Sequence, residues 1–229
     1  MTDLLMPAAV LWDMDGTLVD TEPYWMAAEV AVVSARGGSW TAEQGLQLVG
    51  NALPTSARII LEQTGIPGDP EDLVTELLSA VVERVRSTGA PWRPGAIELL
   101  EQLRERSVPC ALVTASYTPL AQAVVDAAPP GVFATVVTGD VVTNGKPHPE
   151  PYLTAAERLG VDPDRCVALE DSPAGVTSAT AAGARTVAVP LMVPVPPRPG
   201  LSRLSTLDGV GPDLLARVAN GEVIDEVPG

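Results

Sequence analysis

Short apolar runs alternate with helix-like segments over most of this chain. Runs with the length and continuous apolar character of buried strands stand at residues 8–12, 108–113, 134–137, 166–169 and 185–189. Helices are predicted after residue 90 at residues 97–105, 119–128, 149–159, 173–182 and 212–219. Apolar strands separated by helices are typical of a parallel sheet covered on both faces. The pattern therefore predicts an α/β fold, crossed late in the chain by an extended proline-rich surface segment at residues 190–200.

A different pattern follows the first strand. Residues 21 to about 90 contain no strand-like run and predict helices at residues 22–36, 41–49, 55–64 and 70–87. In the last of these, Leu73, Leu77, Val81 and Val85 repeat every four residues, as on the buried face of an amphipathic helix. We therefore expect two domains: an α/β core of residues 1–20 and 91–229, and an inserted all-helical domain of residues 21–90.

Two aspartates directly follow the first predicted strand. Residues two apart on an extended chain project to the same face, so Asp13 and Asp15 are expected to share a small space beyond the strand end. Two carboxylates repel each other by about 4 kcal/mol at 4 Å when the effective dielectric constant is near 20. The pair needs a cation, a proton or a larger separation to persist. Taken alone, the motif could equally be a solvated acidic turn.

Other strand ends carry more polar side chains. Thr114 follows the strand at 108–113, Glu170 and Asp171 follow the strand at 166–169, and Lys146 precedes a predicted helix. Ligands of open parallel sheets bind outside the carboxyl ends of the strands. Each residue alone has a simpler structural reading, such as a helix cap or a surface lysine. Together, these clustered oxygen ligands suit Mg²⁺, and the lysine suits a phosphate oxygen.

These motifs resemble those of the haloacid dehalogenase superfamily, and within it the β-phosphoglucomutase-like phosphatases. The similar segments are Asp13-Met14-Asp15-Gly16-Thr17, Val113-Thr114-Ala115-Ser116, Gly145-Lys146-Pro147 and Glu170-Asp171-Ser172-Pro173-Ala174-Gly175-Val176. The resemblance covers nearly the whole chain. It implies a Rossmann-like parallel sheet sandwiched by helices, with the helical insert as the cap domain of this subgroup.

The resemblance also implies catalytic and metal-binding roles. Asp13 would be the nucleophile that forms an aspartyl-phosphate, and Asp15 the general acid and then the general base. Mg²⁺ would be held by Asp13, the main-chain carbonyl of Asp15 and Asp171, with Glu170 binding directly or through water. The implied reaction is Mg²⁺-dependent hydrolysis of a small phosphate monoester.

Further residues are implied to bind the substrate. Thr114 and Lys146 would bind phosphoryl oxygens, assisted by the backbone N–H groups of Met14 and Ala115. Trp25 would either line the substrate space or pack inside the cap domain. The expected substrate is a small phosphorylated metabolite, such as a sugar phosphate, because a helical cap encloses a small molecule.

Two alternative functions stay open. Sugar phosphomutases of the resembling subgroup carry a histidine where this chain has Trp25, and a cap arginine that is not found around Gly50-Asn51-Ala52-Leu53; only Arg58 lies nearby. These departures favour hydrolysis over mutase activity. A non-enzymatic protein that binds a phosphorylated metabolite is the third reading, although no residue of the predicted active set is missing.

Charge and composition narrow the partners. The formal net charge of −15 disfavours nucleic acid and anionic lipid surfaces. Cys110 and Cys166 lie in strand-like apolar runs, which predicts buried, reduced thiols. Neither a secretory signal nor an apolar run of about 18 residues is visible. We therefore expect a cytoplasmic protein without a membrane partner, present as a monomer or weak dimer.

Overall fold

The computed structural model describes residues 4–48 and 51–227. The chain divides into two compact units: one runs up to Asp20 and resumes at Trp92, and the other spans Thr21–Pro91. The helical unit thus ends at Pro91, one residue later than the expected end at residue 90. Among the described residues, no helix is both long and apolar enough to cross a membrane.

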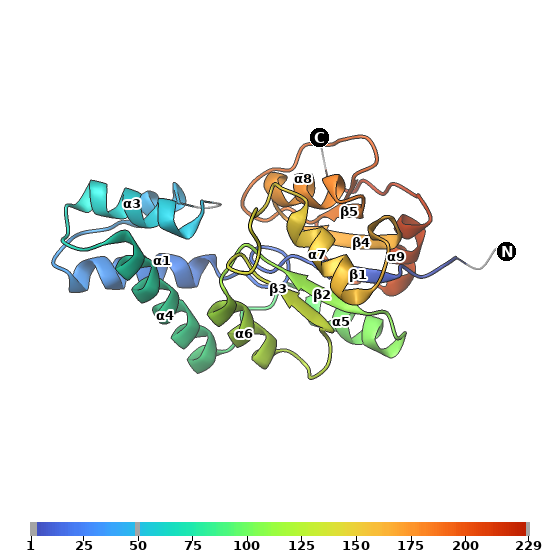
Figure 1. Cartoon of the computed structure of the whole chain (residues 1–229), viewed down its shortest axis with the longest axis horizontal. Coiled ribbons are helices and arrows are strands. Elements are labelled where there is room, and N and C mark those ends of the chain that lie inside the picture. The colour runs from blue at the N-terminus through green and yellow to red at the C-terminus, as the bar shows by residue number, and fades with distance from the viewer. Residues whose placement is uncertain (1–3, 49–50, 228–229) are drawn as a thin grey trace. The chain divides into compact units, whose positions relative to one another are not determined.

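The α/β unit contains a six-stranded sheet with the order β3-β2-β1-β4-β5-β6, in which every neighbouring pair is parallel (Figure 1). The strands are β1 Ala9–Trp12, β2 Cys110–Val113, β3 Thr135–Val137, β4 Cys166–Glu170, β5 Arg185–Ala188 and β6 Ser202–Arg203. Every residue of β1, β2 and β4 is buried, as their continuous apolar sequences predict. The predicted α/β fold is confirmed.

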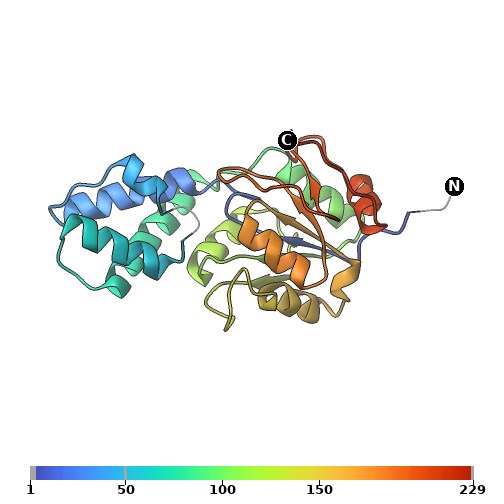
Figure 2. The ribbon, with the colours of Figure 1, turned by 90° about the horizontal axis from the view of Figure 1, so that it is seen from above.

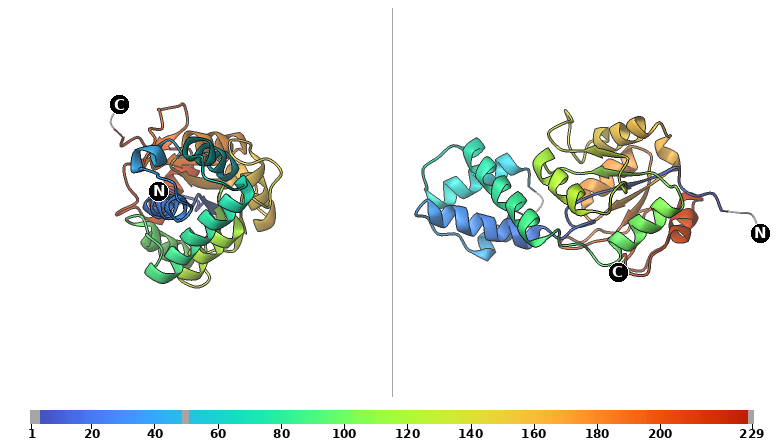
Figure 3. Two further views of the ribbon diagram at one scale, coloured as in Figure 1. Left: turned by 90° about the vertical axis from the view of Figure 1, so that its left-hand side faces the viewer. Right: turned by 90° about the horizontal axis from the view of Figure 1, so that it is seen from below.

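Helices cover both faces of this sheet. They are α5 Ala96–Glu105, α6 Thr118–Ala127, α7 Glu150–Leu159, α8 Pro173–Ala181 and α9 Pro212–Ala219, with a 3₁₀ turn at Pro163–Arg165. Helix α7 contacts β1, β2 and β3 and helix α8 contacts β4 and β5, whereas α5 and α9 contact each other and pack on β2 and β4. The views in Figures 2 and 3 place α7 and α8 on one face of the sheet and α5 and α9 on the other.

The order of the strands creates a switch point at the centre of the sheet. From β1 the chain proceeds outward to β2 and β3, then returns to place β4 on the other side of β1. Connections that diverge from two adjacent parallel strands leave a crevice at the carboxyl ends of those strands. The residues that follow β1 and β4 therefore lie where ligands of such sheets bind.

Strand β6 is not expected from the sequence. It has only two residues, one of them the buried Arg203, and so lacks the apolar signature of a strand. The Arg203 guanidinium is paired with Asp225 at 2.9 Å and donates to the Val195 carbonyl at 3.2 Å. Val195 is itself buried, so the proline-rich crossing does not run along the surface throughout. Arg203 thus ties this crossing to the C-terminal segment.

The two cysteines are confirmed as buried free thiols. Cys110 and Cys166 begin strands β2 and β4, and neither forms a disulfide. Burial raises the pKa of Cys110 to about 12 and that of Cys166 to about 11. Both thiols are therefore protonated and unreactive at neutral pH, because the thiolate is the reactive form.

The second unit is all helical. It contains α1 Glu22–Ala35, α2 Ala42–Leu46, α3 Leu53–Thr64 and α4 Pro70–Thr88. Helix α2 is shorter than the helix predicted over residues 41–49. Residue 49, the last of that predicted helix, lies outside the described residues. So does Gly50, which belongs to the segment searched for a cap arginine. Helix α4 buries the predicted apolar face against α1 and α3.

Glu29 of α1 is an ionisable group buried inside the helical unit. It is 6% exposed, and its Oε2 accepts a hydrogen bond from Trp40 Nε1 at 3.0 Å. Burial raises the pKa of the Glu29 carboxyl to about 7, although the bond from Trp40 opposes this shift. The carboxyl is therefore protonated in the folded protein at pH values where it would be ionised in the unfolded chain.

This raised pKa predicts a pH-dependent contribution to stability. Between pH 4.5 and about 7 the folded protein binds the Glu29 proton more tightly than the unfolded chain, so the free energy of unfolding falls as pH rises. Glu29→Gln should remove this decline, which is at most about 1.4 kcal/mol per pH unit. Urea unfolding at pH 5, 6, 7 and 8 tests this prediction. The difference between the unfolding free energies of variant and wild type at each pH gives the contribution of Glu29. Glu62→Gln, at an exposed position of α3, is the control; equal pH slopes in wild type and Glu29→Gln would contradict the prediction.

Candidate active site

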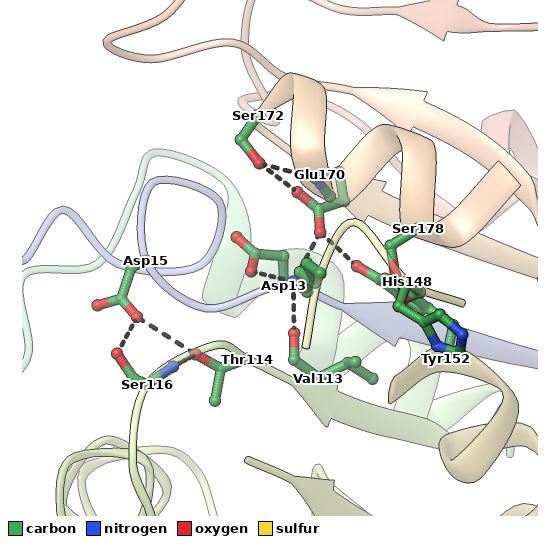
Figure 4. Close-up of polar contacts among 12 residues, drawn as sticks. Asp13, Asp15, Val113, Thr114, Ser116, His148, Tyr152, Glu170, Ser172 and Ser178 are labelled. Carbon is green, nitrogen blue, oxygen red and sulfur yellow. Dashed lines mark hydrogen bonds and ion pairs between the residues drawn. The ribbon is translucent and has the colours of Figure 1, made fainter. Parts of the chain in front are cut away.

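The carboxyl ends of the central strands bring the predicted acidic residues together. Asp13 follows β1, and its backbone N–H donates to the Leu169 carbonyl of β4 at 3.0 Å. Glu170 is the last residue of β4 and is fully buried, while Asp13 is 6% exposed. Parallel pairing of β1 with β4 therefore places the two carboxylates at the same edge of the sheet. Figure 4 shows their side chains close to each other.

Lys146, the only lysine in the sequence, joins these two carboxylates. Its ammonium nitrogen lies 2.6 Å from Asp13 Oδ1, 2.6 Å from Glu170 Oε1 and 2.9 Å from the Val113 carbonyl oxygen. Burial alone would lower the pKa of Lys146, but the adjacent carboxylates of Asp13 and Glu170 hold that pKa above its ordinary value. The group is therefore a permanent positive charge, and these three acceptors use its three protons.

Asp171 adds a third carboxylate to this edge. One oxygen from each of Asp13, Glu170 and Asp171 lies within 4.8 Å of the others. Burial is the largest cause that raises the pKa of Asp171 to about 8, and the negative charges of Asp13 and Glu170 add to it. One lysine thus does not offset the charge of three carboxylates.

The site has the donor chemistry of a divalent cation site. Asp13 Oδ2 is buried and has no hydrogen-bond partner in the part of the chain that the structure describes. An unpartnered buried carboxylate oxygen is costly unless a cation or a donor satisfies it. Carboxylate oxygens from Glu170 and Asp171 lie beside it, and such oxygen ligands suit a hard divalent cation. The residues present therefore fit a cation such as Mg²⁺.

Three residues outside the predicted set support Glu170. The hydroxyl of the fully buried Tyr152, on α7, donates to Glu170 Oε1 at 2.5 Å, and Ser172 donates to Oε2 at 3.3 Å. A Cβ atom at Gly175 would lie 1.9 Å from the Glu170 carboxyl, so only glycine fits there. In the sequence, Tyr152 has the signal of an ordinary core residue on a helix, which is why the motifs did not identify it.

Asp15 lies apart from this network. Its Oδ2 accepts hydrogen bonds from Ser116 Oγ at 2.7 Å and Thr114 Oγ1 at 3.3 Å. Figure 4 shows the Asp15 side chain turned toward these two hydroxyls, whereas Asp13 and Glu170 lie together on the other side. The two aspartates thus have different hydrogen-bond partners. Arg93 donates to the Gly16 carbonyl and so fixes the turn that follows Asp15.

The remaining predicted residues are placed as follows. Thr114 is buried directly after β2, Ala115 is exposed beside it, and the Met14 side chain is fully buried in the core. Trp25 lies on α1 of the helical unit and is half-buried. The α/β unit thus brings together Asp13, Lys146, Glu170 and Asp171, with Asp15 and Thr114 forming a second group.

Fold and candidate site together describe an α/β protein with a cluster of carboxylates and a lysine at a strand switch point. A family model described as haloacid dehalogenase-like hydrolase matches residues 7–183. The chain belongs to this family. It is an enzyme of the hydrolase class, and the predicted resemblance is confirmed.

Individual relatives have the same architecture or related activities. Hexitol phosphatase A of Escherichia coli (strain K12) is 34% identical over 93% of this chain and 96% of its own length. The phosphorylated carbohydrates phosphatase of Thermotoga maritima is 34% identical over 76% of this chain and 81% of its own. A crystal structure of CbbY from Rhodobacter sphaeroides in complex with phosphate superposes with a TM-score of 0.80 at 27% identity, covering 90% of this chain and 97% of that one. These likenesses confirm the prediction of a phosphatase of this family.

Proposed function

We propose that this enzyme hydrolyses phosphate monoesters of small sugars or sugar alcohols through an aspartyl-phosphate on Asp13. The observation that carries the proposal is the state of the Asp13 carboxylate. Lys146 fixes one of its oxygens, while the other is buried without a partner among the described residues. A carboxylate oriented in this way is suited to attack a phosphorus atom. The names of two relatives, hexitol phosphatase A and the phosphorylated carbohydrates phosphatase, support the choice of a sugar-type ester.

The reaction has two steps. In the first, a carboxylate oxygen of Asp13 bonds to phosphorus while the ester oxygen departs with a proton from Asp15. In the second, Asp15 takes a proton from water, and the resulting hydroxide attacks the aspartyl-phosphate to release inorganic phosphate and regenerate Asp13. The separate hydrogen-bonding environments of the two aspartates support this division of roles.

Charge compensation makes the approach of a phosphate dianion possible. Lys146 would bind a phosphoryl oxygen by exchanging one of its three present acceptors for it. Thr114 would donate its hydroxyl proton to a second oxygen, assisted by the backbone N–H groups of Met14 and Ala115. Positioning and charge neutralisation then supply most of the rate enhancement, as in other phosphoryl transfers.

Mg²⁺ is the cation that we propose for the carboxylate cluster. Asp13, Asp171 and the main-chain carbonyl of Asp15 would hold it, with Glu170 binding directly or through water. When bound, it would neutralise the repulsion between the carboxylates and the phosphate. Because Lys146, Tyr152 and Ser172 already donate to Glu170, the orientation of Glu170 is fixed beforehand.

We further propose that the core domain of residues 1–20 and 91–229 performs the chemistry and that the helical unit is its cap domain. The four helices have a buried apolar interior of their own, as an inserted domain requires. Trp25 stays a candidate for the residue through which this domain contributes to substrate specificity.

Phosphate release from a panel of sugar, sugar-alcohol and alkyl phosphates tests the proposed function. We expect release that EDTA lowers by at least about 100-fold and that added Mg²⁺ restores, since a catalytic cation supplies several kcal/mol of transition-state stabilisation. The Asp13→Asn variant, purified in the same way, controls for contaminating phosphatases. Interconversion of sugar phosphate isomers that depends on a sugar bisphosphate and releases no phosphate would instead indicate a mutase. Tight binding without turnover would indicate a metabolite-binding protein.

A further inference from the structure

Two hydroxyl groups of one loop converge on a single oxygen of Asp15. Ser116 Oγ lies 2.7 Å from Asp15 Oδ2, and Thr114 Oγ1 lies 3.3 Å from the same atom (Figure 4). The bond from Ser116 has the usual length of an O–H···O hydrogen bond, whereas the bond from Thr114 is long. Ser116 is therefore the main hydrogen-bond donor of this pair.

The loop that carries Ser116 is itself held by hydrogen bonds. The Ser116 N–H donates to Thr114 Oγ1 at 2.9 Å, and the Gly139 N–H donates to the Ser116 carbonyl at 2.9 Å. Gly139 lies so close to this loop that a Cβ atom there would be 2.2 Å from the Ala115 carbonyl oxygen. The Ser116 hydroxyl thus projects from a backbone that is fixed on both sides, and this favours one direction for its bond to Asp15.

The two hydroxyls differ in what substrate binding requires of them. A threonine hydroxyl has a single proton to donate. In the proposed function, Thr114 donates that proton to a phosphoryl oxygen, so it cannot donate to Asp15 at the same time. Ser116 has no such competing role and can keep its bond to Asp15 throughout the reaction.

We propose that Ser116 is a positioning residue for Asp15, the general acid and base of the reaction. This inference rests on the proposed function. The bond from Ser116 to Oδ2 fixes the plane of the Asp15 carboxyl group, and so the direction in which the carboxyl transfers its proton. As the phosphorus–oxygen bond of the ester breaks, that proton moves to the leaving oxygen and Asp15 becomes a carboxylate, which a hydrogen bond from Ser116 stabilises. The same bond orients Asp15 when it accepts a proton from water.

The dependence of the rate on the leaving group tests this proposal. An alkoxide leaving group needs the proton from Asp15, whereas p-nitrophenolate leaves without one. Ser116→Ala should lower kcat/KM for alkyl and sugar phosphates by about 10- to 100-fold, as a small misplacement of a catalytic group does. For p-nitrophenyl phosphate, the loss should be less than about 3-fold. Ser116→Thr, which restores a hydroxyl, should recover most of the lost activity.

Two controls separate positioning from a general structural effect. Thr118→Ala removes a hydroxyl of the same region that contacts Asp140 and Thr138 rather than Asp15, and should leave the leaving-group dependence unchanged. Asp15→Ala should show the same selective loss as Ser116→Ala but to a greater extent. Adding Ser116→Ala to Asp15→Ala should cause little further loss, because both changes act on one group.

Several outcomes would overturn the inference. Equal losses for alkyl and p-nitrophenyl phosphates, a change confined to KM, or full additivity with Asp15→Ala would each show that Ser116 does not act through Asp15. Wild-type enzyme that releases phosphate while Ser116→Ala is unaffected would overturn this inference alone. Wild-type enzyme that releases no phosphate from any ester would overturn the proposed function as well.

Discussion

Replacement of Asp13 by asparagine should abolish turnover while leaving the fold intact. A neutral amide oxygen is a poor nucleophile, so no acyl-phosphate forms. Because both steps of the reaction depend on this residue, we expect kcat to fall by about 10³-fold or more. Lys146 keeps its ion pair with Glu170 at 2.6 Å and its bond to the Val113 carbonyl, which preserves the local structure. Steady-state phosphate release measures the loss, and thermal unfolding checks the fold.

The matched control for this variant is Asp126→Asn. Asp126 is an exposed aspartate on α6 whose carboxyl accepts a hydrogen bond from Gln122. It should retain wild-type activity although the chemical change is the same. Substantial turnover by Asp13→Asn would contradict the nucleophilic role and leave the carboxylate cluster without the proposed chemistry.

Replacement of Lys146 by methionine should affect both stability and activity. The ammonium group is buried between Asp13 and Glu170, and removing one partner of a buried ion pair typically costs 3–5 kcal/mol. Three carboxylates would then face one another without this charge. We expect a fall of about 3 kcal/mol or more in the free energy of unfolding at pH 7. Phosphate release should also be lost, because no lysine remains in the sequence to bind the phosphate.

Mg²⁺ provides a further measurement on this variant. If the carboxylates form the cation site, added Mg²⁺ should raise the free energy of unfolding more in Lys146→Met than in the wild type, because it replaces the missing positive charge. Arg106→Met is the control, since it breaks an exposed ion pair with Asp213 at 3.0 Å. Such pairs contribute about 0–1 kcal/mol. Similar losses in the two variants, or no response to Mg²⁺, would argue against the cluster.

The sequence predicted most of the elements because their signals are local. Strand β1 is a continuous apolar run, and apolar residues recur every four positions on one face of α4. Both elements were therefore predicted correctly. Strand β6 was missed because two residues, one of them charged, give no periodic signal. Its place in the sheet depends on pairing with β5 and on the ion pair between Arg203 and Asp225.

The candidate site divides in the same way. Asp13, Thr114, Lys146, Glu170 and Asp171 were identified in the sequence because they stand at the ends of apolar runs or in recognisable motifs. Tyr152 was not, because its hydroxyl is aimed at Glu170 by the packing of α7 on the sheet. Ser116 belongs to a quoted motif, but its contact with Asp15 joins residues 101 positions apart.

The sequence by itself thus determined the α/β class and the helical insert, and it supplied the candidate residues of the site. These features depend on periodicity, charge and spacing within short segments of chain. Only the tertiary structure decided that Lys146 contacts Asp13 and Glu170 together, and that Asp15 is bound by the hydroxyls of a different loop. Such contacts arise from the parallel order of the strands and the packing of helices on them, and these are properties of the whole folded chain rather than of any one segment.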